Sequence, residues 1–448
     1  MSLPPGPSQP AAVQTWRFIA RPFPFFEECR QKFGELFSIK LVGIGPSVHV
    51  CRPETVRELF HAPVDRVHAG DSNAVIEPLV GWRSVALIDE AEHARVRRVL
   101  NVPLHGPKMR RHGQTIAAAA RRAISPLRPG ETRPMLPLMQ DISLEVIMRV
   151  IFGASDEELP AASRAVMQMV LAYTAPLLLL PPLRRDLGQW SPGGRFARKR
   201  KIVDDWIYKE IAARRATPEV ERVDVLSLLL GATDGDGTPL TDREIRDQLM
   251  TLFVAGQDTT STALAWALAH VHANPEVRER LDDEIAALGP EPDPDALCTL
   301  PYLSAVCNES LRIIPTVMAA SRLAVKRPFT LEGFDIPPKV YISPNVYLIH
   351  RHPEVFPEPD KFRPERFLDR EYQPWEFLPW GGGARRCIGM ALSFYEMRIV
   401  LGTIVSELRL AAAEPGVPRA LNRGMVISPQ GGTRLRVVER RRVERVAA

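Results

Sequence analysis

Cys387 is placed where a thiol could act as a nucleophile or bind a metal. It follows three consecutive glycines (residues 381–383) and two arginines, and it precedes residues 390–401, whose apolar positions recur at helical spacing. Glycines allow backbone turns with positive φ, and a residue at the start of a helix faces free backbone N–H groups and the positive end of the helix dipole. This setting predicts a lowered thiol pKa, which suits a thiolate nucleophile or a metal ligand. The alternative is a buried, inert cysteine at a turn between a strand and a helix.

His93 and Arg97 lie four residues apart in a stretch predicted to be helical, so both side chains share one helix face. Two hydrogen-bond donors on one face suit an anion. The alternative is a solvated basic face on an amphipathic helix.

A run of poor helix formers, residues 255–262, lies in the middle of a long apolar segment that is predicted to be helical. Gly, Asp and Thr weaken a helix interior, and Thr can hydrogen-bond the carbonyl of the preceding turn and bend the helix. Such a run indicates a functional distortion. A Thr-rich kink or a buried helix contact is the alternative.

Glu309 and Arg312 lie three residues apart on a helix that we expect to end before Pro315. Taken alone, such a pair is a common surface feature that contributes little to stability.

The elements that must position these residues are mostly helical. Thr241 and Glu244 form a predicted capping box, from which a helix continues to about Ala273 and is long enough to cross a whole domain. The other predicted elements are a hairpin at residues 36–42 and 47–51, a short helix at residues 53–60, helices over most of residues 90–315, short strands at residues 320–345 and a final hairpin region at residues 417–438. The predicted fold is mainly α with small β-sheets (α+β). It forms one domain over residues 1–448, with a Pro-rich segment at residues 1–15 and a basic tail at residues 439–448.

Composition limits the class of protein. Hydrophobic residues make up 45% and charged residues 25% of the chain, as in ordinary soluble globular proteins. The 5 cysteines are odd in number and unclustered, which fits a reducing compartment and excludes a disulfide scaffold or a Cys-rich zinc site. The net charge of +5 is modest, and nothing suggests nucleic acid. No run approaches the roughly 18 to 20 apolar residues of a membrane span, and the N-terminus lacks the pattern of a signal peptide. We expect a cytoplasmic protein.

Residues 380–389, WGGGARRCIG, resemble the haem-binding loop of the cytochrome P450 superfamily, F-G-x-G-x-R-x-C-x-G, with Trp380 in place of the usual Phe. Residues 255–260 resemble the family's oxygen-activation motif, A-G-x-[DE]-T-[TS], and the family's H-x-x-x-R, E-x-x-R and P-E-R-F patterns are also present. The resemblance covers nearly the whole chain. It implies the cytochrome P450 fold, in which a long central helix lies over a haem b.

The same resemblance implies how this haem would be held. Cys387 would be the thiolate ligand of the iron, and thiolate ligation favours O–O cleavage. The residues expected to bind the haem propionates are His93, Arg97, Arg322 and Arg385.

The resemblance also implies roles around the reaction site. Ala255 and Gly256 would leave room for haem and dioxygen, Thr259 would hydrogen-bond the dioxygen, and Asp258 would bring in protons through water. The buried ion-pair triad expected beneath the haem loop consists of Glu309, Arg312 and Arg366.

The implied activity is that of a haem-thiolate monooxygenase, which inserts one oxygen atom of O₂ into an apolar organic substrate such as a terpenoid, a steroid-like molecule or a fatty acid. The chain has no cysteine cluster for an iron–sulfur centre and no spare length for a flavin module. We therefore expect a monomer that takes electrons from a separate ferredoxin or flavodoxin and its reductase, docked near Arg386, Arg110 and Arg111. The alternatives are a peroxide-driven peroxygenase or isomerase, which would not need Asp258 and Thr259, and a haem-based gas sensor without chemistry.

Apolar residues in several segments are candidates for a substrate pocket, although each could equally belong to the core. The candidates are Val75, Ile76, Leu79, Leu252, Phe253, Ala255, Val317, Met318 and Ile427, and the apolar run at residues 177–180.

Overall fold

The structure is a computed structural model that describes residues 3–104, 106–173, 181–217, 222–234, 237–318, 322–324, 328–423 and 426–441. In strand β5 (Arg322–Ala324) it describes the backbone alone. Two stretches considered above, the apolar run at residues 177–180 and residues 442–448 of the basic tail, lie outside the described residues.

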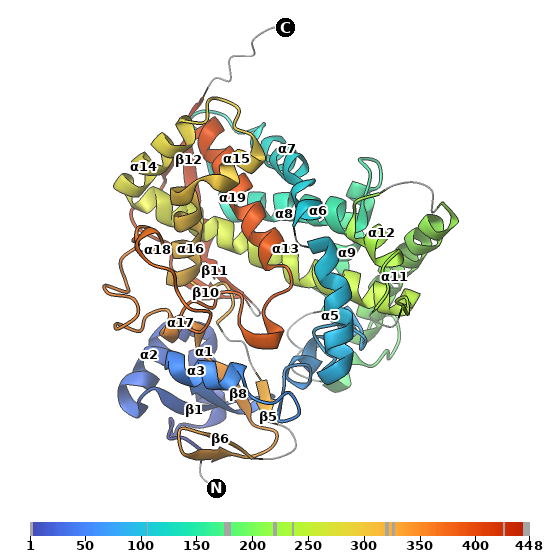
Figure 1. Cartoon of the computed structure of the whole chain (residues 1–448), viewed down its shortest axis with the longest axis vertical. Helices are drawn as coiled ribbons and strands as arrows, with labels where there is room; N and C mark the ends of the chain where they lie inside the picture. The colour runs from blue at the N-terminus through green and yellow to red at the C-terminus, as the bar shows by residue number, and fades with distance from the viewer. Residues whose placement is uncertain are drawn as a thin grey trace.

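Helix α13 (Asp242–Ala273) crosses the centre of the molecule (Figure 1). The predicted capping box is confirmed, because the Thr241 hydroxyl accepts a hydrogen bond from the Glu244 N–H at 3.2 Å and the Glu244 carboxylate accepts one from the Thr241 N–H at 2.9 Å. Most of α13 is buried. The helices that pack against it include α8 (Met135–Phe152), α16 (Pro301–Ile313) and α19 (Met390–Glu407).

Further helices surround this centre. They include α1 (Ala11–Ala20), α2 (Pro22–Phe33), α3 (Pro53–Phe60), α5 (Glu90–Leu104), α7 (Gly113–Ile124), α9 (Leu159–Ala172), α11 (Pro192–Ala216), α14 (Pro275–Ala286), α15 (Pro294–Thr299), α17 (Val346–Ile349) and α18 (Arg366–Asp369). Helix α3 begins and ends at the predicted residues, with Pro53 in its first turn.

The largest described sheet has the strand order β1-β2-β8-β5-β3, formed by β1 (Leu36–Leu41), β2 (Gly45–Val50), β8 (Tyr341–Pro344), β5 and β3 (Val67–His68). It lies with α1, α2 and α3 at the lower end of the view in Figure 1. The predicted hairpin is confirmed, since Leu36 pairs antiparallel with Val50 and Leu41 with Gly45.

The C-terminal strands differ in part from the expected hairpin region. Strands β10 (Ala420–Asn422) and β11 (Ile427–Pro429) form a hairpin. Strand β12 (Arg434–Arg440) pairs instead with β9 (Leu408–Ala412) and β4 (Thr132–Pro134). The alternating burial of Leu435 and Val437 explains this choice, because both side chains join the main core through these distant strands.

The predicted fold class is confirmed, since the described residues are mainly helical with small sheets. One large core cluster joins residues of α5, α7, α8, α13, α16 and α19, and a second cluster lies between α2, β1 and the end of α13. Among the described residues, no helix is both long enough and apolar enough to cross a membrane.

Candidate functional site

The loop before α19 is shaped by its three glycines, each for a local reason. Gly381 and Gly383 have positive φ angles of 66° and 63°, as predicted. Gly382 does not, because its φ of −160° is extended backbone. A Cβ on Gly382 would lie 2.0 Å from the Phe60 ring, so this glycine is required by close packing against α3. Two of the three glycines thus use the positive φ that glycine allows, and Gly382 is needed for close packing.

Backbone hydrogen bonds close this loop around Cys387. The Cys387 N–H donates to the Trp380 carbonyl at 2.8 Å, and the Arg386 N–H donates to the Gly383 carbonyl at 3.1 Å. Helix α19 starts three residues after Cys387. The sulfur therefore lies at the N-terminal end of this helix.

The direction of the Cys387 pKa shift differs from the sequence prediction. Burial raises the pKa of the thiol, while hydrogen bonds from the Gly389 and Met390 N–H groups and the charges of Arg97 and Arg386 lower it. The interactions that we expected to lower the pKa are present, but desolvation outweighs them. The prediction that the thiol pKa is lowered was therefore wrong.

Cys387 is an exposed residue even though protein atoms surround its thiol closely enough for desolvation to dominate the pKa. The sulfur therefore faces an internal space and not bulk solvent. Ala255 has the same character, since it is exposed in the middle of a helix whose neighbouring turns are buried. Both observations indicate a space inside the protein between α13 and residues 380–389, which we call the cysteine loop.

The weakened run of α13 is helical throughout, so the sequence run does not break the helix. The predicted bond to the preceding turn is present, since the Thr259 hydroxyl donates to the Ala255 carbonyl at 2.7 Å. The hydroxyls of Thr260 and Ser393 lie 3.1 Å apart, which fixes this run against the first turns of α19. The structure therefore brings the run and the cysteine helix together.

Helix α5 reaches the same loop. His93 is buried, and Arg97 is half-buried on the next turn. The Arg97 guanidinium donates to the Arg386 carbonyl. Burial lowers the pKa of Arg97, whereas the nearby Cys387 sulfur raises it. Arg97 is therefore the cation that this helix places next to the cysteine.

Arg385 has partners that sequence reasoning did not find. Its guanidinium forms an ion pair with Asp89 and donates to the Val85 carbonyl at 3.0 Å and to the Ile88 carbonyl. Arg322 lies in β5, where its backbone pairs with Ile342.

Glu309, Arg312 and Arg366 meet in the interior as a triad of ion pairs. The Arg312 guanidinium binds the Glu309 carboxylate through two bonds of 2.6 and 2.8 Å, and Arg366 Nε lies 3.1 Å from Glu309 Oε1. At most 1% of each side chain is exposed. The surface-pair alternative is therefore wrong for these residues.

The family model for cytochrome P450 matches residues 4–437, which is nearly the whole chain. The chain belongs to the cytochrome P450 family. The family indicates a haem-thiolate monooxygenase.

Relatives of this P450 match along its length. A Mycobacterium tuberculosis protein named cytochrome P450 135B1 is 34% identical over 441 residues, covering 98% of this chain and 92% of its own. Another from that organism, cytochrome P450 135A1, is 33% identical over 444 residues, covering 98% and 96%.

Solved structures share the fold of this P450. The cyanobacterial CYP120A1 with retinoic acid bound has a TM-score of 0.83 at 23% identity, with 97% of this chain and 99% of that chain covered. The haem domain of cytochrome P450DA has a TM-score of 0.85 at 22% identity, with 98% of both chains covered.

Hydrogen bonds join three helices of this P450 in a closed triangle beside residues 255–262 of α13. Gln140 on α8 donates to the Asp258 carboxylate on α13 at 2.9 Å. Ser143, one turn further along α8, donates to the Glu396 carboxylate on α19 at 2.7 Å, and the Thr260–Ser393 contact links α13 back to α19. Gln140 and Ser143, polar residues three apart in the mostly apolar sequence of α8, were the signal for this network.

Glu396 is the buried ionisable group of this triangle. Burial raises the pKa of its carboxyl to about 7, although the bond from Ser143 lowers it. A carboxyl in this position is thus protonated over a wide range of acidic pH.

The predicted pocket residues divide by exposure. Val75, Ile76 and Val317 keep accessible surface, as does Ala255. Leu79, Leu252 and Met318 are mostly buried, whereas Phe253 and Ile427 are fully buried within the core clusters. The first group therefore keeps more surface available for contact with another molecule than the second.

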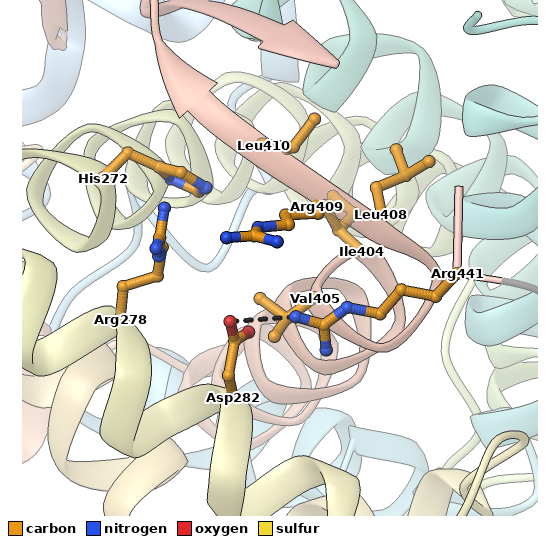
Figure 2. Close-up of a pocket in the computed structure, with 9 residues that line it drawn as sticks. All are labelled: His272, Arg278, Asp282, Ile404, Val405, Leu408, Arg409, Leu410 and Arg441. Carbon is orange, nitrogen blue, oxygen red and sulfur yellow. Dashed lines mark ion pairs between the residues drawn. The ribbon is translucent and has the colours of Figure 1, made fainter. Parts of the chain in front are cut away.

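A small pocket of about 10 Å³ lies away from the cysteine, between α14, α19 and the end of α13 (Figure 2). The ion pair between Asp282 and Arg441, at 2.9 Å, lies at its edge. A space of this size holds at most about one water, so it cannot be the substrate site.

Proposed function

We propose that Cys387 is the thiolate ligand of haem b in this P450. The inward-facing sulfur at the N-terminal end of α19, with the Gly389 and Met390 N–H groups bonded to it, is the observation that carries this proposal. Binding to a metal deprotonates a thiol outright, so the raised pKa of the free thiol is compatible with this role. The sequence contains no C-x-x-C-H motif, which covalent attachment of haem would require, and this favours haem b.

The cationic side chains near Cys387 fit a group that carries carboxylates. Arg97 is half-buried beside the sulfur, and His93 lies one turn away on the same helix. Arg385 is already engaged with Asp89, so its charge would be shared between this carboxylate and a propionate. We assign these three residues, together with Arg322, to propionate binding.

When bound, a thiolate-ligated haem supplies the activation of dioxygen and its reductive cleavage. Thr259 holds a proton at Oγ1 beside the internal space, where it donates to the Ala255 carbonyl. Asp258 holds its carboxylate against the Gln140 amide and can pass protons from solvent toward Thr259 through water. The Glu309–Arg312–Arg366 triad supports the loop that carries Cys387.

The substrate is proposed to be an apolar organic molecule of the terpenoid, steroid-like or fatty-acid class. The accessible side chains of Val75, Ile76, Ala255 and Val317 are uncharged, which supports this class. Electrons are proposed to come from a separate ferredoxin or flavodoxin. Arg386, Arg110 and Arg111 are exposed and could form part of its docking surface.

The test is the absorption spectrum of the purified chain after reduction under carbon monoxide. Thiolate ligation gives a red-shifted band, and Cys387→Ser should lose it. A colourless protein, or a parent without that band, would overturn the proposal. Apolar candidates can then be screened for a change in the spin state of the ferric iron. Turnover with a surrogate reductase, compared with turnover with peroxide, separates a monooxygenase from a peroxygenase.

A further inference from the structure

His350, the residue that caps the C-terminal end of α17, is buried between the ion-pair triad and the cysteine loop, with 0% of the residue exposed. One ring nitrogen, Nδ1, lies 3.2 Å from the Arg312 carbonyl. The other, Nε2, lies 3.0 Å from the backbone nitrogen of Leu378. The imidazole thus connects α16 with the segment that leads into the cysteine loop.

These two contacts fix the proton of His350. A carbonyl oxygen only accepts hydrogen bonds, so Nδ1 must carry the proton and donate. The Leu378 N–H only donates, so Nε2 must be unprotonated and accept. One neutral tautomer satisfies both contacts, and neither the other tautomer nor the imidazolium does. Burial, followed by the charge of Arg312, holds the pKa of His350 well below its usual value, and Arg351 lowers it further.

The hydrogen bond to Leu378 is the first of a series that ends at Cys387. The Leu378 side chain is buried, and its carbonyl accepts from the Gly381 N–H at 2.9 Å. The Trp380 carbonyl then accepts from the Cys387 N–H. Because Leu378 and Trp380 are separated by Pro379 alone, fixing the Leu378 N–H restricts the peptide that holds Cys387.

The contact to α16 is reciprocal. His350 donates to the Arg312 carbonyl, and the Arg312 guanidinium donates to the His350 carbonyl at 2.8 Å. The same guanidinium binds Glu309. The hydrogen bonds of one imidazole thus join the triad to the beginning of the cysteine loop.

We propose that His350 is a positioning residue that sets the cysteine loop in the geometry needed for thiolate ligation. This inference rests on the proposed role of Cys387. His270 provides a matched contrast: it is also buried, with 4% of the residue exposed, burial lowers its pKa to about 3, and its ring stacks on that of Phe362 with centroids 4.8 Å apart. Its Nε2 has no hydrogen-bond partner among the described residues, and the aromatic contacts of its ring are with Trp266 and Phe362, outside the cysteine loop.

The experiment compares His350→Phe, His350→Gln and His270→Phe in the haem-loaded full chain. Phe cannot accept from the Leu378 N–H, whereas Gln can both accept and donate. In the reduced carbon monoxide complex, His350→Phe should raise the ratio of the form without the red-shifted band to the thiolate form by about tenfold or more, with far-ultraviolet circular dichroism unchanged. His350→Gln and His270→Phe should keep the parent ratio.

A folded His350→Phe variant with the parent ratio, or an equal effect in His270→Phe, would overturn the inference. Should His350→Phe not fold, nitrogen-15 chemical shifts of His350 in the parent ferrous carbon monoxide complex decide the matter. Protonated Nδ1 with an accepting Nε2 supports the inference, and protonated Nε2 overturns it. A parent without the thiolate band would instead overturn the role of Cys387 and the inference with it.

Discussion

The Arg385 guanidinium pairs with the Asp89 carboxylate, so a charged contact joins the cysteine loop to the segment before α5. The same carboxylate accepts hydrogen bonds from the Ala69 and Gly70 N–H groups, each at 3.2 Å. One acidic side chain therefore holds three separate parts of the chain around the proposed haem site.

A double-mutant cycle of Asp89→Asn and Arg385→Gln should reveal this coupling. Both side chains are 14% exposed, so each single change leaves a partly buried charge without its partner and should lower the free energy of unfolding by about 1–3 kcal/mol. The double variant should lose less than the sum of the two singles. Urea unfolding of haem-loaded protein measures all three values, and strict additivity would show that the pair is not coupled.

Glu309→Gln should be among the most damaging single changes in this P450. It leaves the buried charges of Arg312 and Arg366 without a carboxylate, which costs roughly 3–5 kcal/mol. We expect loss of haem and a large fall in melting temperature. Asp205→Asn is the matched control, because the Lys201–Asp205 pair is exposed and should contribute less than about 1 kcal/mol. A Glu309→Gln protein with parent haem content would contradict the structural role of the triad.

Thr259→Ala should separate proton delivery from haem binding. The change removes the hydroxyl at the internal space but no contact of the cysteine loop, so the carbon monoxide spectrum should stay at the parent form. Product formed per electron should fall by about tenfold or more, with peroxide appearing instead. Thr262→Ala, on the same helix but fully buried, is the control and should keep the parent yield. An unchanged yield in Thr259→Ala would remove this residue from the relay.

Glu396→Gln should change how stability depends on pH. The pKa of Glu396 is raised from 4.5 to about 7 by burial, so the folded state binds this proton more tightly than the unfolded state does. This group therefore favours folding most at acidic pH, and its contribution falls by up to about 3 kcal/mol as pH rises from about 5 to above 7. Gln keeps the acceptor for Ser143 but carries no charge. Urea unfolding at about pH 5 and about pH 8 should show a smaller difference in the variant, whereas the exposed Glu414→Gln should behave like the parent.

Charge reversal at Arg386 and Arg110 tests the docking surface. Because both residues are exposed, Arg386→Glu and Arg110→Glu should leave the fold intact while slowing electron transfer from an acidic ferredoxin or flavodoxin by about tenfold at low salt. The difference should shrink as salt is raised. Lys40→Glu on β1 is the control surface change. Equal rates and equal salt dependence in all variants would place the partner elsewhere.

Local signals in the sequence were sufficient for much of the fold. The capping box of Thr241 and Glu244 defined where α13 begins, and Pro53 defined where α3 begins, because both depend on neighbouring residues alone. The strand partners of β12 were not predictable in this way. Its pairing with β9 and β4 depends on which distant edges are available once the helices have packed.

The candidate site shows the same division. Residue types and spacing indicated Cys387 and the Asp258–Thr259 pair, and the resemblance to the family indicated the charged triad. They did not reveal that Gln140 holds Asp258, that Asp89 holds Arg385, or that His350 binds the Leu378 N–H. Each of these partners lies more than 25 residues away along the chain, and its contribution exists only after folding brings the two segments together.

The sequence by itself determined which chemistry the chain can carry, because a thiol, a carboxylate beside a hydroxyl and a set of cations are properties of side chains and their order. Only the tertiary structure decided the environment of those groups. The pKa of Cys387 rises, and that of Glu396 reaches about 7, because desolvation depends on the atoms that surround a group in three dimensions and not on its neighbours in the chain.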